Sequence, residues 1–245
     1  KLHFQAAAVT QIDFMSTGPN GNSFLYMKNA SMPELVGKIM FKTSDGNNNF
    51  LFGGTFAYKT LKPRLLNSIG TKVNETISTK SASVFAKYNN DKFAWKVSGI
   101  VGEDMYHLTM IGGYAVRMSN YGIMSNVFEN ELSYTPLISS SVWSDLVYGN
   151  RHQFGLFTGF SRNYGSNNNI FNWENTSSYF ARGQDIHHLY RISPRYMCNI
   201  KNISFGTELE YTVVAYGKKN NSLAEVFDLY DVFNFRALLF IFYKF

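Results

Sequence analysis

Apolar and polar residues alternate along most of this chain with a period of two, which is the pattern of β-strands that have one apolar face. No segment shows a convincing amphipathic helical period. The alternation predicts ten strands, over Lys1–Phe14, Leu35–Thr43, Phe50–Thr60, Ser81–Tyr88, Phe93–Gly102, Glu131–Tyr148, Phe154–Ser161, Tyr190–Ile200, Ile203–Gly217 and Val232–Phe245. We therefore expect an all-β protein.

The connections between these strands alternate between short and long. Short turns, rich in Asn, Asp and Gly, are expected at Ser44–Asn49, Asn89–Lys92, Gly149–Gln153 and Lys201–Asn202. Long connections lie between them, at Met15–Glu34, Leu61–Lys80, Glu103–Asn130, Arg162–Leu189 and Lys218–Asp231. The short turns therefore lie at one end of the sheet and the long loops at the other, as in outer-membrane barrels.

Each predicted strand has one face without Lys, Arg, Asp or Glu, while the opposite face carries the charges. A Lys or Arg on the lipid face at mid-bilayer costs about 2–4 kcal/mol, so strands in contact with lipid must exclude charge there. The pattern predicts a transmembrane antiparallel up-and-down β-barrel of at least ten strands, with short periplasmic turns and long extracellular loops. A half-buried soluble sheet also alternates and is the alternative.

Composition narrows the class further. The 245 residues are 45% hydrophobic and 17% aromatic, which excludes intrinsic disorder. No apolar run approaches the roughly 20 residues of a membrane-spanning helix. Cys198 is the single cysteine, so the chain has no intrachain disulfide.

Aromatic residues gather where the predicted strands meet the ends of the sheet. Phe50, Phe52, Phe93, Trp95, Tyr148, Phe154, Tyr243 and Phe245 flank the short turns or the last residue, and Phe14, Tyr58 and Tyr211 lie nearer the long loops. They resemble the two interface girdles of a barrel, and ordinary cross-strand aromatic pairs are the alternative. The alternating Leu239, Ile241, Tyr243 and Phe245 resemble the C-terminal signal by which the barrel-insertion machinery recognises its substrates.

Several runs resemble porin-like outer-membrane β-barrel proteins of Bacteroides-type Gram-negative bacteria. They are TQIDFMSTGPNGN (Thr10–Asn22), FGGTFAYKTLKPRL (Phe52–Leu65), the run Phe85–Gly113 and the closing FNFRALLFIFYKF. The resemblance implies an integral outer-membrane barrel with a transport-type role, without fixing a solute. It also implies further strands ahead of Lys1, so residues 1–245 are expected to form one barrel domain that lacks some N-terminal strands.

The charged face carries the candidate functional residues, and basic residues predominate on it. Expected pore-lining residues are Lys38, Lys59, Lys96, Arg191, Arg195, Arg236, Glu208 and Glu210. Rings of basic residues in a pore favour anions, so we expect passive diffusion of small polar or anionic solutes with a mild anion preference. In this pore we expect Arg191, Arg195 and Arg236 to face Glu208 and Glu210. Cross-strand salt bridges in a filled lumen are the alternative for these charges.

A barrel without transport activity, acting as a structural or accessory subunit of an outer-membrane complex, is the competing function. Phe85, Phe157, Phe240 and Phe242 on the charged face favour it slightly. The Glu103–Asn130 connection is expected either to fold inward as a constriction or to cover the barrel externally. Besides outer-membrane lipid, a homo-oligomeric or larger membrane complex is an expected partner.

Other functions find little support in the sequence. None of the five histidines lies with a Ser and an acid in a catalytic arrangement, so we expect no enzyme. Adjacent His187 and His188 point to opposite faces of a strand, so we expect no metal site there. No phosphate loop or dinucleotide motif indicates a cofactor, and scattered basic residues do not indicate nucleic-acid binding.

Overall fold

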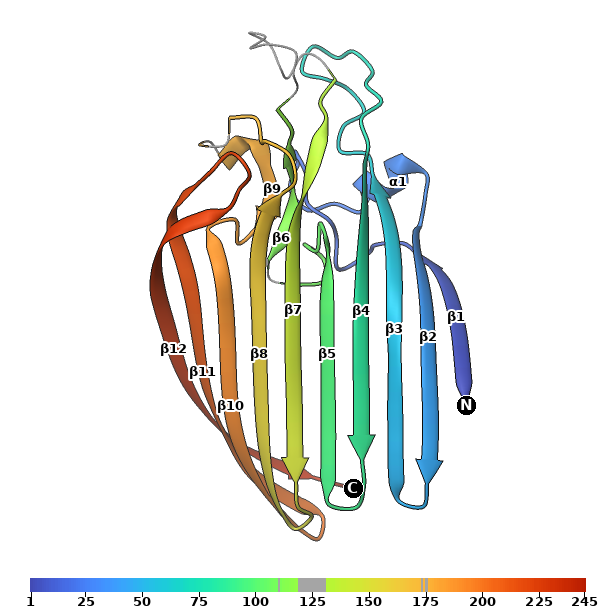
Figure 1. Cartoon of the computed structure of the whole chain (residues 1–245), viewed down its shortest axis with the longest axis vertical. Helices are drawn as coiled ribbons and strands as arrows, with labels where there is room; N and C mark the ends of the chain where they lie inside the picture. Colours follow the sequence, from blue (N-terminus) through green and yellow to red (C-terminus); the bar gives the residue numbers. More distant parts are fainter. Residues whose placement is uncertain (110, 119–130, 173, 175) are drawn as a thin grey trace.

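The computed structural model describes residues 1–109, 111–118, 131–172, 174 and 176–245. Ten long strands form one antiparallel, up-and-down sheet in which each is hydrogen-bonded to the next (Figure 1). They are β1 (Leu2–Val9), β2 (Glu34–Asp45), β3 (Asn48–Leu61), β4 (Ile77–Asn89), β5 (Phe93–Glu103), β7 (Tyr134–Tyr148), β8 (His152–Ser166), β10 (Ile186–Ile200), β11 (Ile203–Asn220) and β12 (Val226–Tyr243). All ten predicted strands are thus confirmed, and so is the all-β class.

The predicted short turns are also confirmed, and local chemistry explains them. Asp45 pairs with Asn48, so two residues connect β2 to β3, and Gly46 has the positive φ of 55° that such a turn requires. Between β4 and β5 the Asn90 side chain accepts hydrogen bonds from the backbone N–H groups of Lys92 (3.0 Å) and Phe93 (2.8 Å). These turns fix the register of the hairpins that they join.

Strand β1 ends earlier than the alternation predicts. Val9 pairs with Glu34, and the residue before Glu34 is Pro33, which has no backbone N–H with which to continue the ladder. The Gln11 side chain turns inward instead, and its Oε1 accepts a hydrogen bond from the Ser16 backbone N–H at 2.8 Å. The segment Thr10–Phe14 therefore lies outside the sheet.

Four short elements at the long-loop end are not predicted, one of which is the 3₁₀ helix Thr176–Ser178. Helix α1 (Leu25–Ala30) is six residues long, too short to show a helical period. Strand β6 (Gly112–Val116) pairs with both β7 and β9 (Tyr179–Arg182), and this connects two of the long loops. At Gly113 (φ 140°) a side chain would overlap the backbone of β9, so glycine permits this approach. Among the described residues, no helix is long and apolar enough to cross a membrane.

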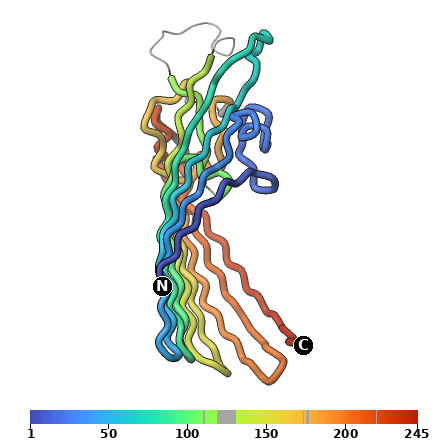
Figure 2. Tube along the Cα trace, turned by 90° about the vertical axis from the view of Figure 1, so that its right-hand side faces the viewer, coloured from blue at the N-terminus to red at the C-terminus, as the bar shows by residue number. Residues whose placement is uncertain are grey.

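The sheet is curved, with β1 and β12 as its two edges. Figure 2 shows the C-terminal strands diverging from the others toward the short-turn end. Within the described residues no pairing joins β1 to β12, and the two edges differ in length, with 8 residues in β1 and 18 in β12. The structure thus shows an antiparallel up-and-down sheet. The pairing of the first and last strands that would close it into the predicted barrel is not seen among the described residues.

The buried core lies at the long-loop end. One cluster contains Tyr26, Met27, Leu61, Ile77 and Tyr114, and a second contains Ala115, Leu137, Ile170, Tyr179 and Ala224. Along the strands, by contrast, large apolar side chains are exposed, such as Phe4 at 71% and Leu239 at 86%. A soluble protein rarely exposes so large a continuous apolar surface.

The register assigns these exposed side chains to one face of the sheet. Residues opposite one another on neighbouring strands point to the same face, so a row can be followed across all ten long strands. One such row is Leu2, Phe41, Phe52, Ala86, Val97, Ser144, Thr158, Ile192, Tyr211 and Phe235. It contains no charged residue, and we call its side of the sheet the outer face.

Candidate functional site

The opposite side of the sheet, the inner face, is the one on which the long loops lie. Lys59 of β3 points to it, and its Nζ lies 2.7 Å from Asp104 Oδ2 and 3.2 Å from His107 Nδ1 in the segment that follows β5. In Figure 2 the segment that follows β1 and the C-terminal strands lie on one side of the N-terminal strands. The inner face is therefore the concave one.

All eight predicted pore-lining residues lie on this inner face by register. A row across it reads Lys42, Leu51, Lys87, Lys96, Asp145, Phe157 and Ser193. Lys38 and Lys59 lie an even number of residues from members of this row, and so do Arg191 and Arg195. Glu208 is opposite Arg195, and Glu210 is opposite Arg236. The predicted set is thus Lys38, Lys59, Lys96, Arg191, Arg195, Arg236, Glu208 and Glu210, all on one face.

The arginines of the C-terminal half contact carboxylates. Glu210 Oε2 accepts from both Arg191 Nη1 (3.2 Å) and Arg236 Nη2 (3.1 Å), and Arg191 Nε donates to Thr212 Oγ1 at 2.9 Å. Both guanidinium groups remain substantially exposed. Because Glu208 lies on the same face, the three arginines and the three acids of this part of the inner face balance in charge.

Arg195 does not form the expected ion pair with Glu208. Its Nη2 lies 2.6 Å from Asp145 Oδ1 on β7, rather than at Glu208, its register partner on β11. Among the described residues no ion pair involves Glu208. The prediction that the arginines face Glu208 and Glu210 therefore holds for Glu210 alone.

Lys59 does not line the open inner face, in contrast to the prediction. Its side chain is 3% exposed and its partner Asp104 is fully buried. Lys59 Nζ also donates to the Asp104 backbone oxygen at 3.0 Å and to Ser16 Oγ at 3.3 Å. His107 Nε2 lies 3.5 Å from Glu34 Oε2, so the cluster continues to β2. Lys59 thus attaches the segment after β5 to the wall.

The contact between Lys59 and Asp104 shows which way the Glu103–Asn130 connection begins. Its first part folds inward, because Asp104 and Met105 are fully buried against the wall. Residues 119–130 lie outside the described residues, so the choice between constriction and external cover is settled only for the first part.

A second ion pair organises the loop between β3 and β4. Both carboxylate oxygens of Glu75 accept from the Arg64 guanidinium, and Glu75 also accepts from Tyr134 Oη at 2.7 Å. Burial raises the pKa of the Glu75 carboxyl, but the hydrogen bonds from Arg64, the Leu132 backbone and Tyr134 outweigh burial, and the pKa lies below its usual range. Glu75 is therefore a charged anchor for this loop.

The C-terminal strand also shows both faces that its sequence predicts. Leu239, Ile241, Tyr243 and Phe245 are exposed, and the first three belong to the outer face by register. On the inner face the Phe240 ring lies over Gly206, where a side chain would overlap the ring. The inner face is therefore partly aromatic near the short-turn end.

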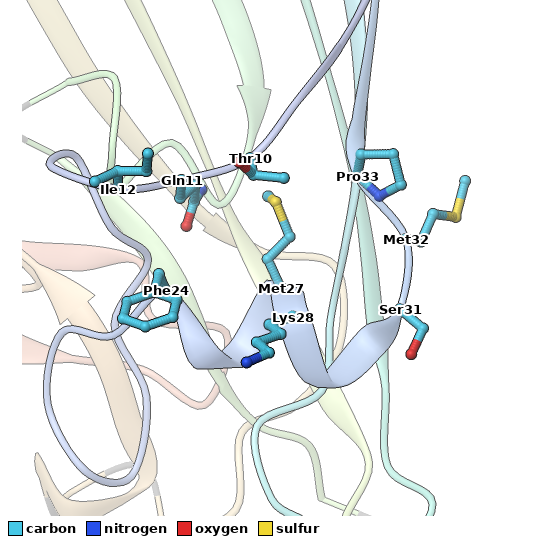
Figure 3. A pocket seen from close by; sticks show the side chains of 9 residues that line it. All are labelled: Thr10, Gln11, Ile12, Phe24, Met27, Lys28, Ser31, Met32 and Pro33. Carbon is cyan, nitrogen blue, oxygen red and sulfur yellow. The ribbon is translucent and has the colours of Figure 1, made fainter.

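One pocket near the inner face is mainly apolar. It has a volume of about 470 Å³ and lies between the Thr10–Ile12 segment and α1 (Figure 3). Met27 extends from the helix toward that segment, Phe24 lies just before the helix, and Lys28 is the one charged residue that lines the pocket. None of the predicted pore-lining residues lines it, and its apolar walls do not suit a charged solute.

Histidines and acids do not assemble a metal site in the described part of the chain, where no three His, Cys, Asp or Glu side chains lie together. The prediction that His187 and His188 point to opposite faces is wrong: a β-bulge lies at this point of β10, and their Nδ1 atoms are 2.8 Å apart. In comparisons with protein-family models, with curated proteins and with solved structures, the chain matches none of them.

Proposed function

We propose that this chain forms the wall of an outer-membrane β-barrel channel that passes small polar solutes, with a preference for anions. The observation that carries the proposal is the division of charge between the two faces of the sheet. A register row across the outer face has no charge, whereas the inner face carries seven exposed or half-exposed Lys and Arg side chains against Asp145, Glu208 and Glu210.

Lipid contact explains why the outer face is apolar although no core covers it. Aromatic side chains on the outer face lie near the short turns, as a membrane-interface girdle would require: Phe50, Tyr88, Phe93, Trp95, Tyr148, Phe154, Tyr196 and Tyr243. The resemblance to porin-like proteins of Bacteroides-type bacteria supports the same location. In this proposal the short turns face the periplasm, and the strand ending in Leu239, Ile241, Tyr243 and Phe245 is recognised by the insertion machinery.

A membrane location also requires that the free edges of β1 and β12 be paired. Unsatisfied backbone groups in hydrocarbon cost several kcal/mol each, so an open sheet edge does not persist there. In the membrane these edges therefore pair, either with each other or with further strands. Since β1 is much shorter than β12, pairing with each other would leave part of β12 uncovered.

Single-channel recording tests the proposal. The full chain, folded in detergent and reconstituted in a planar bilayer with a KCl gradient, should give stable conductance steps and a reversal potential that favours chloride. Insertion is checked separately, by protease protection of the strands in vesicles. Conductance steps with a cation preference would contradict the proposed preference for anions. An inserted chain that never conducts would contradict the proposed channel function.

A second function is favoured by the aromatic residues of the inner face. Trp143 and Phe157 stack there with centroids 6.3 Å apart, and Phe240 contacts Phe242 at 5.0 Å. A lumen filled by such groups would suit a structural or accessory barrel in a larger membrane complex. This function is accepted if the inserted chain is silent and co-purifies with another membrane protein.

A further inference from the structure

Three lysines form a row on the inner face near the short-turn end. Lys42 of β2 is opposite Leu51, Leu51 is opposite Lys87 of β4, and Lys87 is opposite Lys96 of β5. Their side chains are exposed. Lys38 lies on the same face of β2, four residues from Lys42. The three lysines of the row, Lys42, Lys87 and Lys96, are called the lysine cluster below.

The lysine cluster has no carboxylate partner within the part of the chain that the structure describes. Asp145 is opposite Lys96, but its carboxylate is bound by Arg195 at 2.6 Å. The three arginines of the inner face, in contrast, all contact acids. The positive charge of the cluster is therefore not neutralised by the chain itself.

Lys87 and Lys96 are a directly opposed pair of like charges, with Cβ atoms about 5 Å apart in such pairs. Like charges in this position destabilise a sheet unless an anion lies between them. Lys42 lies two strands from Lys87, roughly 10 Å away at the backbone, a gap that two flexible lysine side chains can span. Three ammonium groups can therefore converge on one small anion.

The floor beside this row is apolar. The Phe85 ring lies over Gly53, where a Cβ would come within 2.6 Å of Phe85 Cζ, and Lys38 Nζ lies 5.3 Å from the centre of that ring. This cation–π contact holds Lys38 on the far side of Phe85 from the row.

We propose that the lysine cluster is a binding site for a small multivalent oxyanion of the phosphate type. Lysine ammonium groups bind phosphate oxygens as point charges from several directions, which suits a compact tetrahedral anion. This inference rests on the proposed function: it gives the channel a solute class and a saturable site. It predicts that phosphate binds in preference to chloride.

Binding is measured without any reference to conduction. Inorganic phosphate is titrated calorimetrically at mildly alkaline pH into the full chain folded in detergent micelles, in chloride buffer. We expect saturable binding that the double variant Lys87→Gln/Lys96→Gln weakens about tenfold or more. Lys72→Gln is the matched control, because it removes one exposed lysine from the loop between β3 and β4, and it should bind phosphate like the parent chain.

The outcomes separate this site from the channel. Absence of saturable binding, or an equal loss in Lys72→Gln, would overturn the inference even if the chain conducts. Binding that depends on Lys87 and Lys96 supports it even if the bilayer stays silent, in which case the proposed transport fails instead. Should the double variant not fold, Lys96→Gln alone is used, because removing one charge of the opposed pair relieves repulsion and should keep or raise stability.

Discussion

Arg195 on β10 reaches Asp145 on β7 across the intervening strand β8. The two charged groups are 2.6 Å apart, and the arginine side chain passes over Gly155, its register partner on β8. A Cβ at Gly155 would lie 2.5 Å from Arg195 Nε. The ion pair therefore depends on a glycine in the strand between its partners.

Replacing Gly155 with alanine should separate this pair at modest cost. The new methyl group displaces a flexible side chain rather than backbone, and a partly exposed ion pair contributes about 0–1 kcal/mol. We expect the free energy of unfolding in denaturant to fall by no more than about that amount. Gly159→Ala on the same strand is the control, since its neighbour there is the Phe157 ring. A loss of several kcal/mol would show that Gly155 has another role.

The buried pair Lys59–Asp104 should be far more sensitive. Asp104→Asn keeps a residue that tolerates the positive φ of 45° at this position, so its effect reports on charge. Leaving the buried Lys59 without its counterion should cost about 3–5 kcal/mol of unfolding free energy.

The double variant Lys59→Met/Asp104→Asn should recover part of that loss, because it removes the buried unpaired charge. Denaturant unfolding of the single and double variants completes the thermodynamic cycle. If the double variant loses as much as the two single variants together, the pair is not coupled, and the assignment of Lys59 as the attachment point is wrong.

Acid should loosen the loop between β3 and β4. The folded pKa of Glu75 lies below its ordinary value of 4.5, so its ion pair stabilises the fold above that pH. This contribution is lost as the pH falls below the ordinary value and through the lowered folded pKa. The protection of the loop amides against hydrogen exchange, relative to the intrinsic exchange rate at each pH, should fall over that range. Glu75→Gln should show low protection at neutral pH and little further change in acid.

The lipid-facing assignment of the outer face can be tested with two neighbouring lysine substitutions. Val84 is exposed on the outer face, while Ser98, the partner of Phe85, is on the inner face. Val84→Lys should lower the stability of the chain folded in lipid vesicles by about 2–4 kcal/mol, and Ser98→Lys should have little effect. Equal effects would contradict lipid contact with the outer face.

The sequence predicts the wall well because its determinants are local. Period-two alternation and turn residues such as Gly46 and Asn90 lie within each hairpin, and they set both strand limits and faces. The inner-face placement of residues such as Arg191 and Lys96 follows from parity alone.

The remaining features depend on contacts between distant segments. The burial of Lys59 requires Asp104, and the deviation of Arg195 from Glu208 requires Gly155 and Asp145 in register. Strand β6 is too short to show a period, and it is wholly buried between β7 and β9. The early end of β1 has a local signal in Pro33, which marks where its partner β2 can no longer pair.

The pairing pattern of the sheet has a consequence for the order of folding. Each long strand pairs with the next long strand along the chain, so the wall can grow by successive hairpins. Four of these hairpins close short turns, and the longer connections add only slowly to the entropic cost of loop closure. The β6–β9 pairing instead joins Gly112 to Arg182, far apart in sequence. We therefore expect the wall to assemble first, and the β6–β9 pair to close the long-loop end in a later, slower step.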